Sequence, residues 1–277
     1  MDDLTDLFRS WPYDPQQTMR IIVARDGRSV LQVRLPLGIE QYEMEGRPDG
    51  VRPDGFDTVL DRTQHRLKEH IFDTGGDAGF YVTPREAAEL QAEGVLFYYR
   101  YLLLFQLRNF DSVLRDTEHN LHLCDILERY CENEEARNAV LQFRPYIIRM
   151  NIAARALAIA RGELPGDALE VIDEGITRIE RLEEIDSPAF QFERIRSVNY
   201  LQGLRRKIET SDGDDPAGVG EPDVDSYEDV EPGTGTPHEE GDATDLRSRL
   251  ERELQNAVDA EDYERAAQIR DALKRRR

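Results

Sequence analysis

The sequence predicts an α+β protein that is mostly α-helical, with a small antiparallel β meander ahead of a stack of helical hairpins. Three observations carry this prediction. Residues 18–45 are rich in β-branched side chains around an Asp-Gly turn, apolar residues recur at helical spacing from Phe56 onward, and residues 209–245 contain almost nothing that could form a core. With 277 residues, of which 39% are hydrophobic, the chain is long enough for one sizeable domain with attachments, or for two small domains.

The predicted meander has three strands. MRIIVA and SVLQVRLPL flank RDGR, where Asp26-Gly27 could supply the positive φ angles of a tight hairpin. IEQYEMEG then alternates apolar and polar residues with the period of a half-exposed third strand. Two copies of Pro-Asp-Gly follow within residues 46–56, and we interpret them as consecutive turns with glycine in the left-handed position. A rigid rim loop that binds a ligand is the alternative.

The first helices follow these turns. One is predicted over 57–72, with an inward stripe made of Val59, Leu60, Leu67 and Ile71. TPRE at 83–86 then has the pattern of a capping box with proline at the first helical position, and a strongly apolar helix should run from there to about Arg108. A further helix is predicted over 109–130, with inward residues Val113, Leu114, Leu121, Leu123, Ile126 and Leu127.

The helical arrangement partly recurs. Residues 147–182 read as two helices separated by a break at Gly162–Gly166, and a last helix at 189–209 would cap the stack. The second helix of this pair directs inward Ala168, Leu169, Ile172, Ile176 and Ile179. Small residues in the first would let its neighbours approach closely: Ala153, Ala154, Ala156, Ala158 and Ala160. The two pairs resemble tetratricopeptide-type stacking, with a longer spacing than that family's period.

Charge is distributed unevenly along the chain. The formal net charge is −21, which argues against nucleic acid as the main ligand. Residues 209–245 carry fourteen acidic side chains, four prolines, six glycines and no Lys or Arg, a composition that predicts a disordered, extended linker. Residues 246–277 carry nine basic and seven acidic side chains.

The cysteines and the apolar segments suggest a compartment. Two cysteines, Cys124 and Cys131, make no disulfide framework, so we expect a reducing cytoplasm and two small core residues. The acidic N-terminus lacks the layout of a secretory signal. The longest apolar stretch is interrupted by Arg100 and is too short to cross a bilayer, so we expect a cytoplasmic protein without a membrane partner.

The chain closes with a predicted helical hairpin broken at DAED (259–262), where Asp262 can cap the second helix. Two apolar stripes on this hairpin form a seam that is too small to be stable alone, because ordering a short hairpin outweighs what it can bury by itself. We therefore expect a partner to cover it. The expected partner-binding residues are Leu246, Leu250, Leu254, Ala257, Val258, Tyr263, Ala266, Ala267, Ile269, Arg270 and Leu273.

Residues 246–274 resemble the UVR motif, the helical hairpin shared by UvrB and UvrC of bacterial nucleotide excision repair. The motif also occurs in Clp-type quality-control factors and in other bacterial proteins. The matching positions are Leu250, Leu254, Ala257, Val258, Glu261, Asp262, Tyr263, Ala266, Ala267, Ile269, Arg270 and Asp271. The resemblance implies a protein partner: another UVR hairpin, on a different protein or on a second copy of this chain, or the surface of a client protein.

The chemistry of the related repair enzymes has no counterpart in this sequence. It has no GxxxxGK[ST] loop, GGDAGF lacks a phosphate-binding lysine, and neither a nuclease motif nor paired zinc cysteines are recognisable. We therefore expect no catalytic residues, no metal site and no cofactor. EHNLHLC (118–124) is the residual metal candidate, with His119 and His122 at i,i+3 beside Glu118 and Cys124, although a solvated helix face explains these residues better.

Other aromatic and histidine residues have ordinary interpretations. Tyr98, Tyr99 and Tyr101 could stack on bases, but core packing explains them without a basic groove. His65 and His70 have no evident nucleophile or carboxylate pairing, so we expect both to be exposed.

These observations predict four parts and one function. The parts are a small β unit with a turn-rich loop (1–56), a helical repeat-like domain (57–208), a disordered acidic linker (209–245) and a UVR helical hairpin (246–277). The function is that of a non-enzymatic adaptor that docks partners through the tethered hairpin. The alternative is an accessory factor of nucleotide excision repair that contacts UvrB or UvrC, or touches DNA weakly. An enzyme that uses the 46–80 loops is the weakest hypothesis, because no acid–base or nucleophile set is evident.

Overall fold

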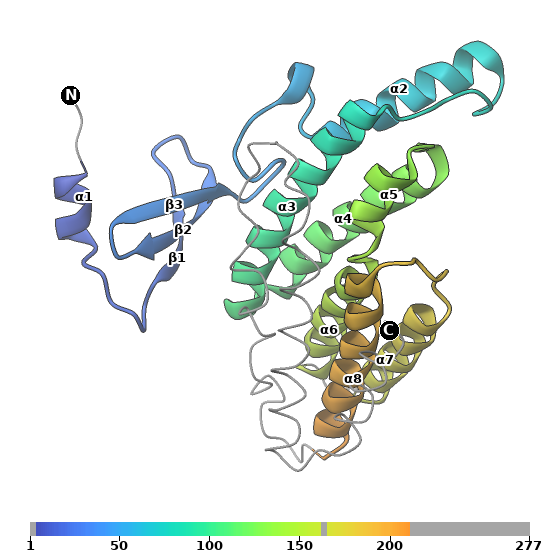
Figure 1. Ribbon diagram of the computed structural model, residues 1–277. Helices are drawn as coiled ribbons and strands as arrows, with labels where there is room; N and C mark the ends of the chain where they lie inside the picture. Colours follow the sequence, from blue (N-terminus) through green and yellow to red (C-terminus); the bar gives the residue numbers. More distant parts are fainter. Residues whose placement is uncertain (1–3, 162–164, 211–277) are drawn as a thin grey trace. The chain divides into compact units, whose positions relative to one another are not determined.

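A computed structural model describes residues 4–161 and 165–210 of the chain (Figure 1). The chain divides into two compact units, Met1–Glu221 and Pro222–Arg277. The second unit lies outside the described residues, as do the predicted UVR hairpin and all but the first two residues of the predicted linker. The described helices and strands therefore all belong to the first unit.

The described residues confirm the α+β class, mostly helical, with one three-stranded antiparallel sheet in the order β1-β2-β3. In chain order the elements are α1 (Thr5–Ser10), β1 (Met19–Val23), β2 (Ser29–Leu35), β3 (Gly38–Glu43), the short 3₁₀ turn η1 (Pro53–Gly55), α2 (Val59–Thr74), α3 (Pro84–Gln106), α4 (Phe110–Tyr130), α5 (Glu134–Leu141), α6 (Arg144–Ala160), α7 (Pro165–Glu180) and α8 (Pro188–Thr210). No helix among them is both long and apolar enough to cross a membrane.

The β meander forms where the sequence predicts it, but its first turn differs. Only Gly27 has a positive φ (87°), whereas Asp26 does not. Gly27 N donates to Ala24 O (3.0 Å) and Ala24 N to Arg28 O (2.7 Å), so Ala24 pairs with Arg28 and the turn between them has three residues, 25–27. An ordinary turn followed by a left-handed glycine needs only one positive φ. Asp26 instead accepts hydrogen bonds from Arg28.

The N-terminal residues cover one face of the sheet. The guanidinium of Arg34 donates to Trp11 O (3.0 Å) and lies 4.3 Å from the Phe8 ring, while that of Arg20 lies 3.8 Å from the Trp11 ring. These cation–π contacts attach α1, which the sequence did not predict, to strands β1 and β2. Gln32 and Arg34 of the central strand β2, which share a face, are both buried.

Helix α2 begins with a regular cap and ends with a left-handed glycine. The Thr58 side chain accepts from Asp61 N, and Gly75 has a φ of 81°. Val59 and Leu60 are buried as predicted, whereas Ile71 is 40% exposed, so its assignment to the inward stripe was wrong. Leu67 is partly buried against the core, and only the last turn of α2 extends past it: the residue after Ile71, Phe72, is 89% exposed.

Helix α3 begins with the predicted capping box. Thr83 and Glu86 exchange hydrogen bonds between their side chains and each other's backbone N–H, and Pro84 occupies the first turn. Helix α4 is capped by Asn109 and buries most of its predicted inward residues. Both cysteines are buried and free, as expected for small core residues.

The later helices pack around α6, which contacts α4, α7 and α8. Its residues Ala153, Ala154 and Ala156 are fully buried, which confirms the close approach expected of small side chains. Helix α7 comes nearest at Gly175, where a Cβ atom would lie 2.6 Å from the Ile152 side chain. The tetratricopeptide-type stacking and the four-part division remain predictions, and α5 was not predicted.

Candidate functional site

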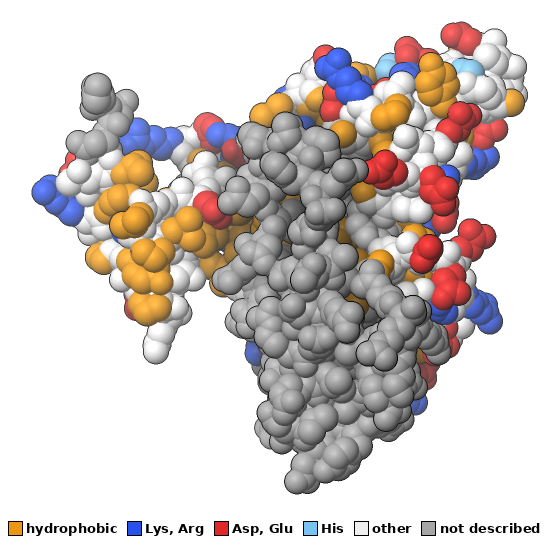
Figure 2. All heavy atoms as spheres, in the orientation of Figure 1, with side chains coloured by type: hydrophobic (Ala, Val, Ile, Leu, Met, Phe, Trp, Pro, Cys, Tyr) orange, Lys and Arg blue, Asp and Glu red, His pale blue; other side chains and the backbone are white. Residues whose placement is uncertain are grey.

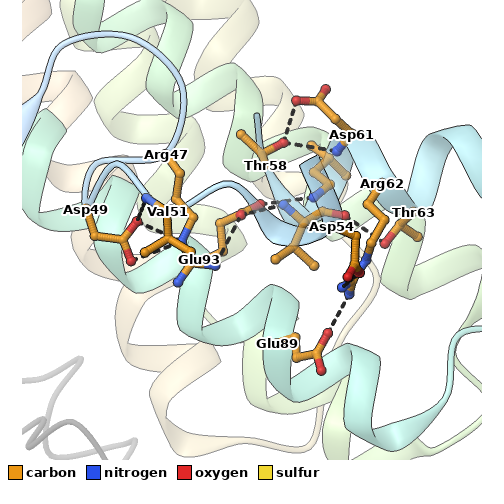
Figure 3. Close-up of polar contacts among 12 residues, drawn as sticks. Arg47, Asp49, Val51, Asp54, Thr58, Asp61, Arg62, Thr63, Glu89 and Glu93 are labelled. Atoms are coloured by element: carbon orange, nitrogen blue, oxygen red, sulfur yellow. Dashed lines mark hydrogen bonds and ion pairs between the residues drawn. The ribbon is translucent and has the colours of Figure 1, made fainter. Parts of the chain in front are cut away.

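The predicted partner-binding residues from Leu246 to Leu273 lie outside the described residues. The first unit does hold a set of buried charged side chains, which contacts the turn-rich loop, the N-terminus of α2, and helices α3 and α4. Figure 3 shows one of them, Glu93, with its surroundings. We refer to Glu93, Arg100 and Asp116 as the buried charge cluster. Each of the three side chains is fully buried.

Glu93, on α3, binds the first turn of α2. Its carboxylate accepts hydrogen bonds from Val59 N (2.6 Å) and Leu60 N (3.0 Å), as Figure 3 shows. These two amides point out of the helix start, where no intrahelical acceptor exists and where the helix dipole favours a negative charge. Arg47 Nη1 lies 3.9 Å from the same carboxylate, and His119 Nε2 lies 3.2 Å from it.

Arg100 lies two helical turns after Glu93 and binds both an acid and the loop. Its Nε and Nη2 donate to the two carboxylate oxygens of Asp116 on α4, at 2.7 and 2.8 Å. Its Nη1 donates to the backbone oxygens of Glu43 (2.6 Å) and Gly46 (2.9 Å). The arginine thereby satisfies a buried carboxylate, the outward carbonyl at the end of β3 and a carbonyl of the following loop, neither of which the sheet ladder satisfies.

The rest of the loop is held by arginines nearer the surface. Arg47 Nε donates to Asp49, whose Oδ1 also accepts from Val51 N (3.0 Å). Arg62 on α2 joins Asp54 of the second Pro-Asp-Gly turn to Glu89 of α3 (Figure 3). Gly50 and Gly55 have positive φ as predicted, and Asp54 does too (52°). These contacts favour the interpretation of the twin turns as a structural connection.

The carboxylates of the buried charge cluster are engaged and offer no general base. Both oxygens of Glu93 accept backbone N–H groups, and both oxygens of Asp116 accept guanidinium N–H groups. A catalytic acid or base must reach a substrate proton, and these groups are enclosed. The arrangement can position the loop and the start of α2, which is a structural role.

The residual metal candidate is not assembled. His119 points toward α3, where its ring stacks on Phe97 at 3.7 Å, whereas His122 and Glu118 are exposed and Arg155 lies 3.5 Å from Glu118. Cys124 is fully buried, and this burial raises the pKa of its thiol to about 12. Over the part of the chain that the structure describes, no three potential metal-ligating side chains come together.

The remaining aromatic candidates pack against one another, and the two remaining histidines differ in exposure. Tyr98 lies against Tyr101, Tyr99 and Tyr146 with ring centroids 5.3–5.8 Å apart, which bears out the expected packing. His65 is exposed as expected, but His70 is half-buried, with Nε2 3.0 Å from Ala78 O.

A further polar group lies between α6 and α8. The guanidinium of Arg149 is buried 4.4 Å from the Tyr146 ring and 5.3 Å from the Tyr200 ring. Burial is the main reason that the pKa of each tyrosine is raised, so both stay protonated.

Sequence reasoning missed the buried charge cluster, although one signal was present. Arg100 interrupts the most apolar stretch of the chain, and Glu93 precedes it by two helical turns on the same side of the helix. A charged residue on an apolar helix face requires a buried partner. The identity of that partner, Asp116, depends on the packing of α3 against α4 and cannot be read from spacing.

Comparison with known proteins identifies one segment. Residues 244–275 match the family model described as the UvrB/uvrC motif, which confirms the resemblance found at 246–274. The match covers a small part of the chain and leaves the first unit unassigned. No curated protein and no solved structure matches the chain at a significant level.

Proposed function

We propose that this protein is a non-enzymatic adaptor that docks a protein partner through residues 246–277. The observation that carries the proposal is the match of residues 244–275 to the UvrB/uvrC motif. The sequence of this segment supplies an apolar seam without enough residues to bury it internally. A second polypeptide is the natural cover for such a seam.

The first unit supports the proposal through its chemistry. The buried carboxylates of Glu93 and Asp116 are each engaged by backbone or guanidinium donors. We assign the docking function to the UVR segment because that segment has the family match, and we propose that the first unit is the body that carries it. Residues 209–245, with their fourteen acidic side chains, would act as a tether. A tether raises the effective concentration of the hairpin for any partner that is already close to the first unit.

The experiment that tests this proposal compares three full-length chains in chemical cross-linking followed by affinity capture and mass spectrometry. The seam variant carries Leu250→Asp and Leu254→Asp, which place charge on the predicted seam. The control, Leu37→Asp, makes the same kind of change on the body at a side chain that is 93% exposed. We expect the seam variant to lose the partners that wild type and control retain. Equal capture by all three chains would contradict the proposal.

A second candidate function is support of nucleotide excision repair, because the matched motif is named for UvrB and UvrC. In that case the partner is one of those subunits. Purified UvrB and UvrC would bind the wild-type chain directly, and the seam variant would bind at least about tenfold more weakly. DNA affinity that falls steeply with salt would instead indicate direct DNA contact. Absence of both results would remove this candidate.

A further inference from the structure

The two edges of the β sheet differ in how their backbone groups are satisfied. At the β3 edge, Glu43 N donates to Pro48 O (2.8 Å) and Glu43 O accepts from Arg100. The neighbouring residues on this strand, Glu40 and Gln41, are exposed and polar. The β3 edge thus has the features that natural sheets use to avoid pairing with another strand: a covering loop and charged side chains.

The register of the sheet shows which groups β1 presents at the other edge. Ala24 N donates to Arg28 O and Arg34 N donates to Thr18 O, so residues 18 and 24 direct their backbone groups toward β2. Backbone direction alternates along a strand. Met19, Ile21 and Val23 therefore direct their N–H and C=O groups away from the sheet. In the described part of the chain, no backbone hydrogen bond outside the β1–β2 ladder involves these three residues.

The same three residues carry apolar side chains on one face. Ile21 and Val23 are 42% and 72% exposed, although they lie beside the buried Leu31 of β2. Hydrophobic side chains gather on the surface over this sheet (Figure 2). An edge strand with free backbone groups, exposed apolar side chains, no proline and no bulge is suited to accept another strand.

We propose that β1 pairs antiparallel with β1 of a second copy of this chain, giving a continuous six-stranded sheet across a two-fold axis at Ile21. In this register Ile21 lies opposite Ile21 of the second copy, and Met19 lies opposite Val23. All three outward-pointing residues on each copy then form hydrogen-bonded pairs, and every pair brings apolar side chains together on one face. A two-fold axis makes the interface self-complementary.

Charge at the two ends of β1 favours a second copy of this chain as the partner and favours antiparallel over parallel pairing. Asp14 lies in the turn before β1, and Arg25 lies in the turn after it. Asp26, in the same turn as Arg25, pairs with Arg28 at 2.8 Å, so this turn keeps a net positive charge. Antiparallel pairing brings the Arg25 turn of one copy to the Asp14 turn of the other, which carries the opposite charge. Parallel pairing would place Asp14 beside Asp14 and Arg25 beside Arg25, which is unfavourable.

Sedimentation velocity of full-length proteins from low to high micromolar concentration tests the pairing. Ile21→Pro removes an outward N–H without removing a donor of the β1–β2 ladder, and Val23→Lys places a charge in the contact. Leu37→Lys is the matched control, since it adds the same charge at an exposed apolar residue outside β1. The edge variants should dimerise at least about tenfold more weakly than wild type, and the control should match wild type.

A second measurement keeps the test independent of correct folding in any one variant. In the wild-type chain, amide hydrogen exchange at Met19, Ile21 and Val23 should slow as concentration rises, whereas exchange at Arg20 and Ile22 should not change. The far-UV circular dichroism of each variant confirms that it is folded.

The outcomes separate this inference from the proposed function. Dimerisation of the seam variant together with loss of dimer in the edge variants supports pairing through β1. A wild-type chain that is monomeric at every concentration overturns it, and so does a dimer that survives both edge substitutions. A dimer that is lost only in the seam variant would contradict the proposal and assign self-association to the UVR segment. Binding of a different protein to β1 by a chain that forms no dimer would contradict it as well.

Discussion

The α3–α4 pair and the α6–α7 pair bury their contact faces by opposite means. Between α3 and α4 lie an arginine and an aspartate that are fully buried, Arg100 and Asp116. Between α6 and α7 there is instead a close approach of Gly175 to Ile152. The charged interface receives an irregular loop whose carbonyls need donors, while the small-residue interface joins only regular helices, whose backbone groups are satisfied internally.

The difference indicates what each interface specifies. Arg100 fixes the position of the Glu43–Gly46 loop as well as that of α4, because one guanidinium reaches both. Loss of such a group leaves several buried polar atoms without partners. Loss of the glycine, by contrast, forces two helices apart and leaves their hydrogen bonds intact. Substitutions at the two interfaces should therefore lower the free energy of unfolding by different amounts.

The largest effect is expected for Arg100→Met. Among the described residues, Asp116 would keep Arg115 as its one side-chain partner, at 3.1 Å, and the carbonyls of Glu43 and Gly46 would lose the guanidinium donor. We expect the free energy of unfolding to fall by about 3–5 kcal/mol, as for other buried pairs broken on one side. Urea unfolding followed by circular dichroism measures it. The double variant Arg100→Met/Asp116→Leu should be less destabilised than Arg100→Met, because no buried carboxylate is left without its partner. An Arg100→Met variant as stable as wild type would contradict the account.

The next effect is expected at the helix contact. Gly175→Ala places a Cβ atom 2.6 Å from the Ile152 side chain, which cannot move freely because it is buried. Overpacking of this kind destabilises by about 1–3 kcal/mol.

The control for this prediction is Gly203→Ala, where no atom lies within 4 Å of the added carbon. That change should stabilise α8 by about 0.5–1 kcal/mol, because alanine is the better helix former. Ile152→Ala should lower the free energy of unfolding less in the Gly175→Ala background than in wild type, because it makes room for the added Cβ atom. A double-mutant cycle measured by urea unfolding would detect the difference. Additive effects would show that the two residues do not touch.

The smallest effect concerns a surface contact of the loop. Arg62 donates to Glu89, and this hydrogen bond is the main reason that the pKa of Glu89 lies below its ordinary value of 4.5. A carboxyl group whose pKa is lower in the folded state stabilises the fold above its unfolded-state pKa, and that stabilisation is lost as the pH falls through the folded-state pKa. Arg62→Gln should therefore lower stability slightly at neutral pH and weaken its acid dependence.

Unfolding by urea between neutral pH and about pH 3 measures this change. Arg52→Gln removes the same charge from an exposed pair with Asp57 and serves as the control. If the stability of Arg62→Gln and of wild type changed with pH in the same way across this range, Arg62 would not be what lowers the pKa of Glu89.

Much of the fold could be predicted because its signals are local. The capping box of Thr83 and Glu86, the strand alternation of residues 18–45 and the inward residues of α4 each depend on neighbours in sequence. The errors arise where tertiary contacts decide. Ile71 has helical spacing but lies in the last turn of α2, which extends past the core, and α1 is held by arginines of the sheet rather than by its own pattern.

The candidate sites divide in the same way. The UVR segment was found from its sequence alone, because the motif is specific over a short continuous stretch. The buried charge cluster joins residues that lie far apart in the chain: Val59 with Glu93, and Glu43 with Arg100. The free β1 edge likewise became evident only from the strand order and register, since the sequence of β1 does not show whether a neighbouring segment pairs with its outer edge.

The most direct test of the proposed docking role uses the UVR segment by itself. A synthetic peptide of residues 246–277 should be weakly helical at low micromolar concentration, and it should gain helix only as its concentration rises or when a partner is added. Circular dichroism with sedimentation equilibrium measures both properties. A peptide that is monomeric, fully helical and cooperatively melting at low micromolar concentration would contradict the claim that another polypeptide must cover the seam.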